Sequence, residues 1–177
     1  MNIREASLGD AAAIAQVHVD SWRSTYRGII PDTILAELSY EQRERQWEET
    51  VGDTEQREFV YVAENPATGI IGFASGGAAL DKSDQLYKGE LFSIYIQDAY
   101  QHQGLGRRLF LRVVERLIQM KLTSMLIWVL AENPARGFYE TLGGRFVKTG
   151  SFEIGGKKIE QVAYGWADIT RLISSHC

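Results

Sequence analysis

Residues 89–111 combine an apolar strand pattern, a short polar stretch and two glycines that open a helix. Aromatic and β-branched residues at 91–96 are typical of a strand buried in a sheet. Gly104 and Gly106 then precede a run in which apolar residues recur at helical spacing up to Met120. The first amides of a helix lack partners within it and carry the positive end of its dipole. The sequence therefore predicts a strand, a glycine turn and a helix whose start suits a phosphate or pyrophosphate.

Two common phosphate motifs do not fit this turn. A P-loop places Lys and then Ser or Thr after its last glycine, whereas Arg107 and Arg108 follow Gly106 here. The dinucleotide fingerprint needs three glycines, and Gln101 occupies the place of the first. Glycine turns are common, so an ordinary strand-to-helix connection remains an alternative for this segment taken alone.

The rest of the chain predicts a mixed α/β fold in a single domain over residues 1–177. Its length allows one sizeable core, and it contains no internal repeat or linker. The continuous apolar run at 124–130 indicates a central strand buried on both faces. The expected strands cover 1–6, 59–63, 70–74, 91–96, 124–130, 146–152 and 158–166, and the expected helices cover 11–26, 31–50, 105–120 and 133–142.

Charge is distributed unevenly along a chain whose formal net charge is −4. Residues 1–64 hold six arginines and no lysine against thirteen acidic residues, whereas residues 101–121 hold five basic residues and one acidic residue. Each cluster alone is compatible with solvated helix faces. Together they favour a cationic acceptor on the N-terminal side and an anionic cofactor at the glycine turn, and they argue against a general nucleic-acid binder.

Several classes of protein are excluded or disfavoured by composition. No apolar run reaches the ~20 residues that span a bilayer, so no membrane association is expected. The N-terminus lacks an apolar signal core, and the single Cys177 cannot form an internal disulfide, which makes a cytoplasmic location the default. Three scattered histidines and one cysteine do not have metal-ligand spacing, so no metal is expected.

The pattern Gln101-x-x-Gly104-x-Gly106 after a strand resembles the coenzyme A pyrophosphate loop of the GNAT superfamily of acyl-CoA-dependent N-acyltransferases. The order of the expected elements also resembles the GNAT fold, which implies a mixed, mostly antiparallel sheet of about seven strands flanked by about four helices. The resemblance implies acetyl-CoA as cofactor. Implied cofactor contacts are the strand backbone at Ile94, Tyr95 and Ile96 and the loop residues Gln101, His102, Gln103, Gly104, Leu105, Gly106 and Arg107.

Residues 133–144, Asn-Pro-Ala-Arg-Gly-Phe-Tyr-Glu-Thr-Leu-Gly-Gly, resemble the superfamily's Asn-x-x-Ala-x-x-Phe-Tyr-Glu-x-x-Gly-Phe segment. They depart from it in two places, because Ala135 stands one residue early and Arg145 separates the last glycine from phenylalanine. The resemblance implies that Asn133 and Arg136 contact the cofactor and that Tyr139 faces its sulfur as general acid. A helix tyrosine that only packs on the sheet is the alternative.

Glu90 lies eleven residues before Gln101, the spacing at which histone-acetylating members of the superfamily carry a general-base glutamate. An alkyl ammonium with a pKa near ~10.4 cannot be deprotonated easily by a carboxylate of ~4.3. Burial must therefore raise the pKa of Glu90, or a water chain must take the proton, or the proton must leave after attack. A surface carboxylate at the strand end is the alternative.

Residues 18–31 resemble a recurrent N-terminal segment of a bacterial GNAT subgroup whose acceptors are mostly unassigned. Trp22 and Tyr26 share a helical stripe that borders the acceptor cleft in this fold, although such stripes also form cores.

The resemblance as a whole implies an N-acetyltransferase that moves an acetyl group from acetyl-CoA to a primary amine by direct attack in a ternary complex. The amine belongs to a small molecule or a peptide. A catalytically silent acyl-CoA-binding or sensing module and an unrelated nucleotide binder are the alternatives, and a homodimer stays open.

Overall fold

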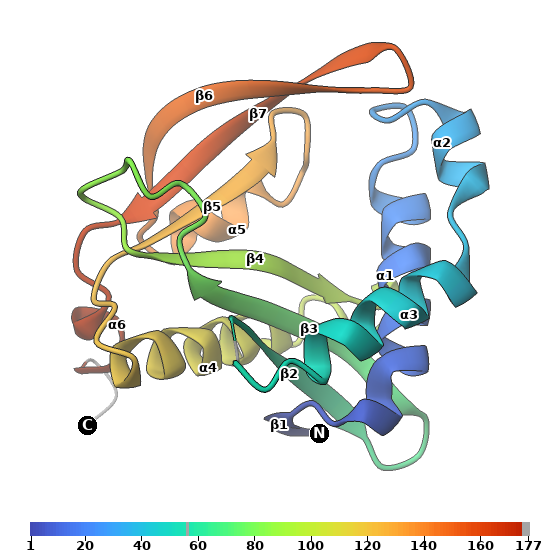
Figure 1. Ribbon diagram of the computed structural model, residues 1–177, viewed down its shortest axis with the longest axis horizontal. Helices are drawn as coiled ribbons and strands as arrows, with labels where there is room; N and C mark the ends of the chain where they lie inside the picture. Colours follow the sequence, from blue (N-terminus) through green and yellow to red (C-terminus); the bar gives the residue numbers. More distant parts are fainter. Residues whose placement is uncertain (56, 175–177) are drawn as a thin grey trace.

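Seven strands form one twisted sheet in the order β1-β2-β3-β4-β5-β7-β6, within a computed structural model that describes residues 1–55 and 57–174 (Figure 1). Only β4 and β5 are parallel, and all other neighbours are antiparallel. This confirms the predicted mixed, mostly antiparallel sheet. Cys177, the single cysteine of the sequence, lies outside the described residues. The strands are β1 Asn2–Glu5, β2 Glu58–Asn65, β3 Gly69–Ala78, β4 Gly89–Ile96, β5 Met125–Leu130, β6 Arg145–Ile154 and β7 Lys157–Trp166.

Helices cover both faces of the sheet. Helix α4 lies on one face, and α1 and α3 pack on the other, where they meet strands β2 and β3 (Figure 1). The helices are α1 Ala11–Thr25, α2 Asp32–Glu37, α3 Tyr40–Val51, α4 Leu105–Gln119, α5 Arg136–Thr141 and α6 Thr170–Ser174, with single 3-10 turns at Leu8–Asp10 and Asp98–Tyr100.

The prediction of one helix across 31–50 is wrong, because the chain breaks between α2 and α3. Leu38 and Ser39 adopt extended backbone angles, and the Ser39 hydroxyl accepts a hydrogen bond of 3.2 Å from the Gln42 amide as the N-cap of α3. The guanidinium of Arg23 donates to the Leu38 carbonyl at 2.7 Å and thereby ties the break to α1. Helix α6 was not expected from the sequence either.

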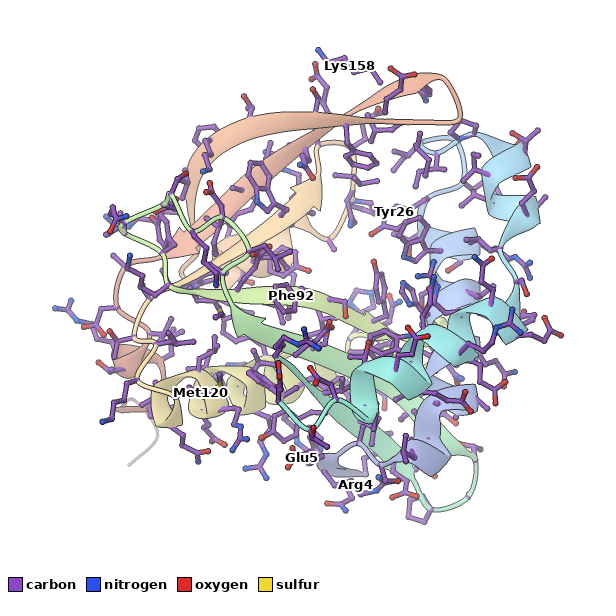
Figure 2. The ribbon with its side chains drawn as sticks, viewed as in Figure 1. Arg4, Glu5, Tyr26, Phe92, Met120 and Lys158 are labelled. Atoms are coloured by element: carbon purple, nitrogen blue, oxygen red, sulfur yellow. The ribbon has the colours of Figure 1, made fainter. Side chains whose placement is uncertain are left out.

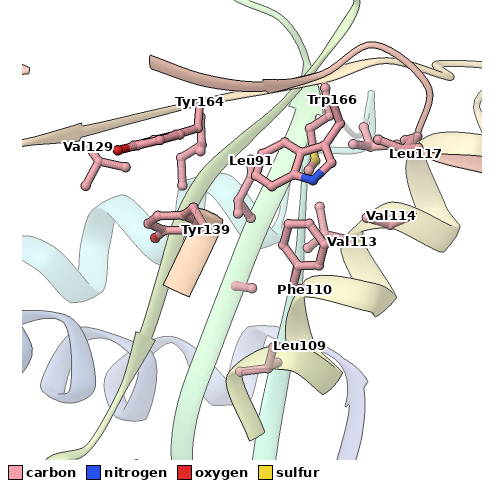
Figure 3. Close-up of a cluster of buried hydrophobic side chains, with 14 of the residues drawn as sticks. Leu91, Leu109, Phe110, Val113, Val114, Leu117, Val129, Tyr139, Tyr164 and Trp166 are labelled. Atoms are coloured by element: carbon pink, nitrogen blue, oxygen red, sulfur yellow. The ribbon is translucent and has the colours of Figure 1, made fainter. Parts of the chain in front are cut away.

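The apolar stripe of α4 forms the main core, as its periodicity predicts. Leu109, Phe110 and Val113 are fully buried and face the sheet, where Phe110 lies 5.3 Å from the ring of Trp166 (Figure 3). Burial of each such side chain stabilises the fold by about 1.5–3 kcal/mol relative to exposure. The strongly packed α4 therefore gives the glycine turn at its start a rigid support.

Asp10 at the start of α1 is held by charge and by hydrogen bonds, and its removal should destabilise the fold. Its carboxylate receives two bonds from Arg4, at 2.7 and 2.9 Å, and one from the Ser7 amide at 2.7 Å. The hydrogen bond with Arg4 lowers the pKa of Asp10 to about 2. We expect Asp10→Asn to lower the free energy of unfolding by about 1–2 kcal/mol at neutral pH, after allowance for the partly exposed Arg4.

Because the folded-state pKa of Asp10 is depressed, this contribution is present above the ordinary value of 3.8 and is lost as the pH falls through about 2. Urea unfolding at pH 7 and near pH 2 checks it. The difference in the free energy of unfolding between the parent and Asp10→Asn should shrink at the lower pH. The control Glu153→Gln, at an exposed strand position, should unfold like the parent at both pH values. An equal loss at both pH values would contradict the account.

Candidate active site

The sheet opens between β4 and β5. These strands pair only at Gly89 with Met125 and Glu90 with Leu126, and β5 then diverges from β4 (Figure 1). The register between β3 and β4 also shifts at this point, because Phe92 is an extra residue on β4. Such a bulge bends its strand. The part of β4 beyond Phe92 consequently has one edge without a strand partner.

Backbone alternation decides which amides of β4 face the opening. The Gln97 amide donates to the Ile71 carbonyl of β3 at 2.9 Å. Successive residues of a strand direct their N–H groups to opposite sides, so the amides of Ile94 and Ile96 point toward β5 and the amide of Tyr95 points toward β3. Two of the three predicted backbone positions thus face the opening, and Tyr95 does not.

The loop after β4 is held by side chains and by left-handed backbone. Gln101 donates through Nε2 to the Ile96 carbonyl and to Asp98 Oδ1, both at 3.0 Å, so its side chain supports the loop from within. His102 and Gly104 have φ angles of 58° and 77°, which is left-handed backbone. Glycine adopts this conformation without strain, which explains why residue 104 is a glycine. The Gln103 side chain donates to the Ala99 carbonyl at 3.2 Å.

The loop and the first turn of α4 present a row of free backbone donors. Among the described residues, no acceptor within hydrogen-bonding distance is found for the amides of 102–107, and the first bond at this end of α4 joins the Arg108 amide to the Gly104 carbonyl. A Cβ at Gly106 would lie 3.2 Å from the Phe138 ring, so glycine keeps this turn open. Leu105 is buried and offers only its backbone, whereas His102 and Arg107 are exposed. Free amides at a helix start fit a pyrophosphate.

Asn133 and Arg136 shape the turn between β5 and α5. Asn133 is buried, and its Oδ1 accepts from the Ala135 amide at 2.8 Å, which explains why α5 begins at Arg136 rather than at Asn133. Arg136 donates to the Tyr164 hydroxyl and to the Ala131 carbonyl, each at 3.0 Å. These bonds tie Arg136 to β7 and to the turn after β5, and its contact with a cofactor stays a prediction.

Tyr139 lies inside the core at the opening. Its side chain is 5% exposed, and its ring lies 5.2 Å from Phe138 and 6.4 Å from Tyr164 (Figure 3). Burial, with a smaller effect of Tyr95, raises the pKa of Tyr139 well above its usual range. Complete proton transfer to a thiolate of pKa ~8.5 is therefore more unfavourable than for an ordinary tyrosine. The neutral hydroxyl is suited to donate a hydrogen bond.

Aromatic hydroxyls gather at the same end of the opening. The Tyr95 hydroxyl accepts from Trp22 Nε1 at 3.0 Å and lies 3.2 Å from the Tyr26 hydroxyl, with Tyr26 at the end of α1 (Figure 2). Burial raises the pKa of Tyr26, and the neighbouring Tyr139 adds to this shift while Asn133 opposes it. The side chain of Tyr95 was missed by sequence reasoning, which considered only its backbone. The alternation of side chains along the strand was the signal that could have placed the Tyr95 ring on the face of α1.

Glu90 lies at the opposite end of the opening. Its side chain is 8% exposed and accepts from the Leu80 amide at 3.0 Å, so the alternative of an exposed strand-end carboxylate is wrong. Burial raises the pKa of Glu90. Glu90 and Tyr95 are five positions apart, about 16 Å along the strand, and no described hydrogen bond joins Glu90 to Tyr139. No described hydrogen bond therefore connects Glu90 with the aromatic hydroxyls at the other end.

Within the described ranges, no group of three or more His, Cys, Asp or Glu side chains has the arrangement of a metal site. No helix in the same ranges is both long and apolar enough to cross a membrane.

Known proteins resemble this chain in sequence and in fold. A family model described as FR47-like protein matches residues 69–152. The uncharacterized N-acetyltransferase YuaI of Bacillus subtilis is 38% identical over 172 residues, which are 97% of this chain and 96% of YuaI.

Two solved structures share the fold at low sequence identity. The PaiA N-acetyltransferase of Thermoplasma acidophilum, in complex with coenzyme A, has a TM-score of 0.71 at 20% identity over 90% of this chain and 96% of its own. YncA of Salmonella typhimurium, with acetyl-CoA, has a TM-score of 0.69 at 20% identity over 94% of this chain and 92% of its own.

Proposed function

Because this chain belongs to the GNAT superfamily of N-acetyltransferases, and is therefore an acyltransferase, we propose that it moves an acetyl group from acetyl-CoA to a primary amine. The observation that carries this proposal is the opening between β4 and β5, which runs from a row of free loop amides to a buried tyrosine hydroxyl. Acceptor and donor would be bound together, and the amine would attack directly. The acceptor is a small molecule or a peptide.

The loop at 101–107 and the edge of β4 would hold the donor. The free amides of 102–107 suit the pyrophosphate, with Arg107 adding a positive charge at the surface. The amides of Ile94 and Ile96 face the opening and suit the pantetheine arm and the thioester carbonyl. Bound acetyl-CoA supplies an activated acyl group.

Fixed donors in this opening would stabilise the charge that develops during transfer. An amide that already points to the carbonyl oxygen needs no reorganisation, and such donors are worth about 3–4 kcal/mol each in other enzymes. Tyr139 would donate its hydroxyl hydrogen to the leaving sulfur, because its raised pKa keeps the hydroxyl neutral. Trp22 and Tyr26 would border the acceptor on the other side.

Glu90 would remove the proton of the acceptor through water. Its buried carboxylate has a raised pKa, which narrows the gap to the ammonium of the acceptor. The acceptor amine would lie between Glu90 and the aromatic hydroxyls at the other end of the opening. Glu90 is in this proposal a base that acts through ordered water rather than by direct contact.

Substitution of Glu90 by glutamine tests this role. We expect Glu90→Gln to lower kcat/KM by about 10- to 100-fold at neutral pH, in the range of general-base contributions. The parent should lose activity as the pH falls through the raised pKa of Glu90, and the variant should lack this limb of the profile. The measurement is kcat/KM against pH with one amine.

The matched control is Glu153→Gln, at an exposed position of β6. An unchanged acid limb in Glu90→Gln would remove Glu90 from the mechanism and leave water alone as proton acceptor.

Turnover separates this proposal from a silent acyl-CoA-binding module on the same fold. Both bind coenzyme A, so binding alone does not distinguish them. A screen of amines for release of free thiol from acetyl-CoA, with identification of the N-acetylated product, should give a signal that depends on Tyr139. Binding without any thiol release across the screen would favour the silent module.

A further inference from the structure

A cavity of about 250 Å³ lies between α3 and the sheet, on the face opposite α4. Helix α1 forms one part of its wall, and α3 and strands β2, β3 and β4 form the rest. Pockets for drug-sized ligands measure about 300–1,000 Å³. A cavity slightly below this range suits a molecule of a few non-hydrogen atoms rather than a peptide or a nucleotide.

Two side chains of opposite charge line this cavity. Arg43 comes from α3 and Glu58 from the start of β2, and both are partly buried. No ion pair joins them in the part of the chain that the structure describes. Burial lowers the pKa of Arg43 and raises the pKa of Glu58, and the charge of neither residue affects the pKa of the other. The two charges therefore stand apart and do not compensate each other.

The guanidinium of Arg43 keeps one edge for a ligand. Its Nη1 donates to Gln46 Oε1 at 2.9 Å. Among the described residues no acceptor is found for its Nε and Nη2, and neither atom is sealed in the interior. Nε and Nη2 lie on one edge of the planar group and match the two oxygens of a carboxylate.

Two serine hydroxyls form the polar floor of the cavity. Ser75 pairs with Ser93 across β3 and β4, and their hydroxyl oxygens lie 2.7 Å apart. Ser75 also pairs with Val60 of β2, so Glu58, two positions before Val60, shares their face of the sheet. A pair of hydroxyls uses one of its two hydrogens internally, and the other hydrogen and the remaining lone pairs stay available. The floor can therefore solvate a charged ligand beside Glu58.

The remaining wall of the cavity carries no charge at neutral pH. Phe92, on β4 in Figure 2, and Trp47 are apolar. His18 accepts a hydrogen bond of 3.2 Å from Trp47 through Nδ1, and burial lowers its pKa to about 3, with a smaller effect of Arg43. A ligand that is only cationic would meet Arg43, and one that is only anionic would meet Glu58. Such repulsion selects for a molecule that carries both charges.

We propose that this cavity binds a small amino acid in its zwitterionic form, with the carboxylate on Arg43 and the ammonium on Glu58. The two charges of the ligand supply the partners that these side chains lack in the described chain, which offsets the cost of their burial. This inference goes beyond the proposed function, because it assigns a ligand to a cavity outside the opening and requires no acyl transfer.

Isothermal titration of five small molecules into the whole protein tests this assignment, at low ionic strength and without acetyl-CoA. L-alanine, 3-aminopropanoate and 4-aminobutanoate carry both charges at increasing separation. 1-Aminobutane and butanoate carry one charge each. For the parent we expect the best of the three zwitterions to bind at least about tenfold more tightly than either molecule with a single charge.

Two variants test the roles of the charged side chains. Arg43→Gln and Glu58→Gln should each weaken the binding of the best zwitterion at least about tenfold. Arg43→Gln should also bind 1-aminobutane more tightly than the parent does, and Glu58→Gln should do the same for butanoate, because each variant removes a repulsion. A loss of folded protein would weaken every ligand and could not give this crossed pattern. The matched controls are Arg45→Gln and Glu49→Gln, on the exposed side of α3, which should stay within about twofold of the parent.

Three results would overturn the assignment. They are a Kd above about 10 mM for all three zwitterions, binding of a singly charged molecule as tight as that of the best zwitterion, or an equal loss in the cavity variants and the controls. Thiol release from acetyl-CoA tests the proposed function separately, because the titrations contain no acyl donor. Failure of one proposal is therefore distinguishable from failure of the other.

Discussion

Replacement of Tyr139 by phenylalanine is expected to lower kcat by a factor of about ten to a few hundred with little change in the affinity for coenzyme A. Phenylalanine keeps the ring contacts with Phe138 and Tyr164 and removes only the hydroxyl. Because burial holds this hydroxyl neutral, its loss removes a hydrogen bond to the leaving sulfur rather than a complete proton transfer. Steady-state kinetics with a saturating amine measure the effect.

Tyr61→Phe is the matched control, because Tyr61 lies on β2, outside the opening, and is also partly buried. It should keep kcat within about twofold of the parent. Tyr139→Phe with a turnover equally close to that of the parent, on the best acceptor, would remove Tyr139 from the mechanism. Unchanged coenzyme A binding in Tyr139→Phe excludes a loss of folded protein as the cause.

Aspartate in place of Gly106 is expected to raise the Kd for coenzyme A by at least about a hundredfold. Its carboxylate would stand among the free amides of 102–107, where the pyrophosphate is proposed to bind, and would repel it. The fold should persist, since an acidic residue in the first turn favours a helix. Isothermal titration measures Kd, and circular dichroism measures the fold.

Gly106→Ala separates charge from size at this position. In both variants the new Cβ lies 3.2 Å from the Phe138 ring and 3.4 Å from Ile96 Cδ1. Alanine and aspartate therefore require the same small shift of these side chains. Alanine should raise Kd by less than about tenfold. Equal losses in both variants would indicate crowding, and no loss with aspartate would place the pyrophosphate elsewhere.

Local patterns in the sequence were sufficient for the elements and for the loop. The stripe of α4 predicts its buried face because one period of 3.6 residues describes the whole helix. The glycine spacing predicts the free amides of 102–107 because a helix start always leaves donors unpaired. The break between α2 and α3 could not be predicted in this way, since the Ser39 cap and the Arg23 bonds from α1 decide it.

The candidate site was predicted less completely, because its geometry depends on contacts across strands. Resemblance to the family's segments implied roles for Glu90 and Tyr139, which stay predictions, and the divergence of β4 and β5 could not be read from the sequence. The side chain of Tyr95 belongs to the site because the strand turns its backbone toward β3 and its ring toward α1.

The most direct test of the central claim is amine-dependent release of free thiol from acetyl-CoA by the purified protein, followed by mass spectrometry of the amine. The account predicts that thiol release increases with amine concentration to saturation, that each thiol is matched by one N-acetylated amine, and that Tyr139→Phe shows a tenfold or larger loss. Saturable binding of coenzyme A, with thiol release that stays at the uncatalysed rate for every amine, would contradict it.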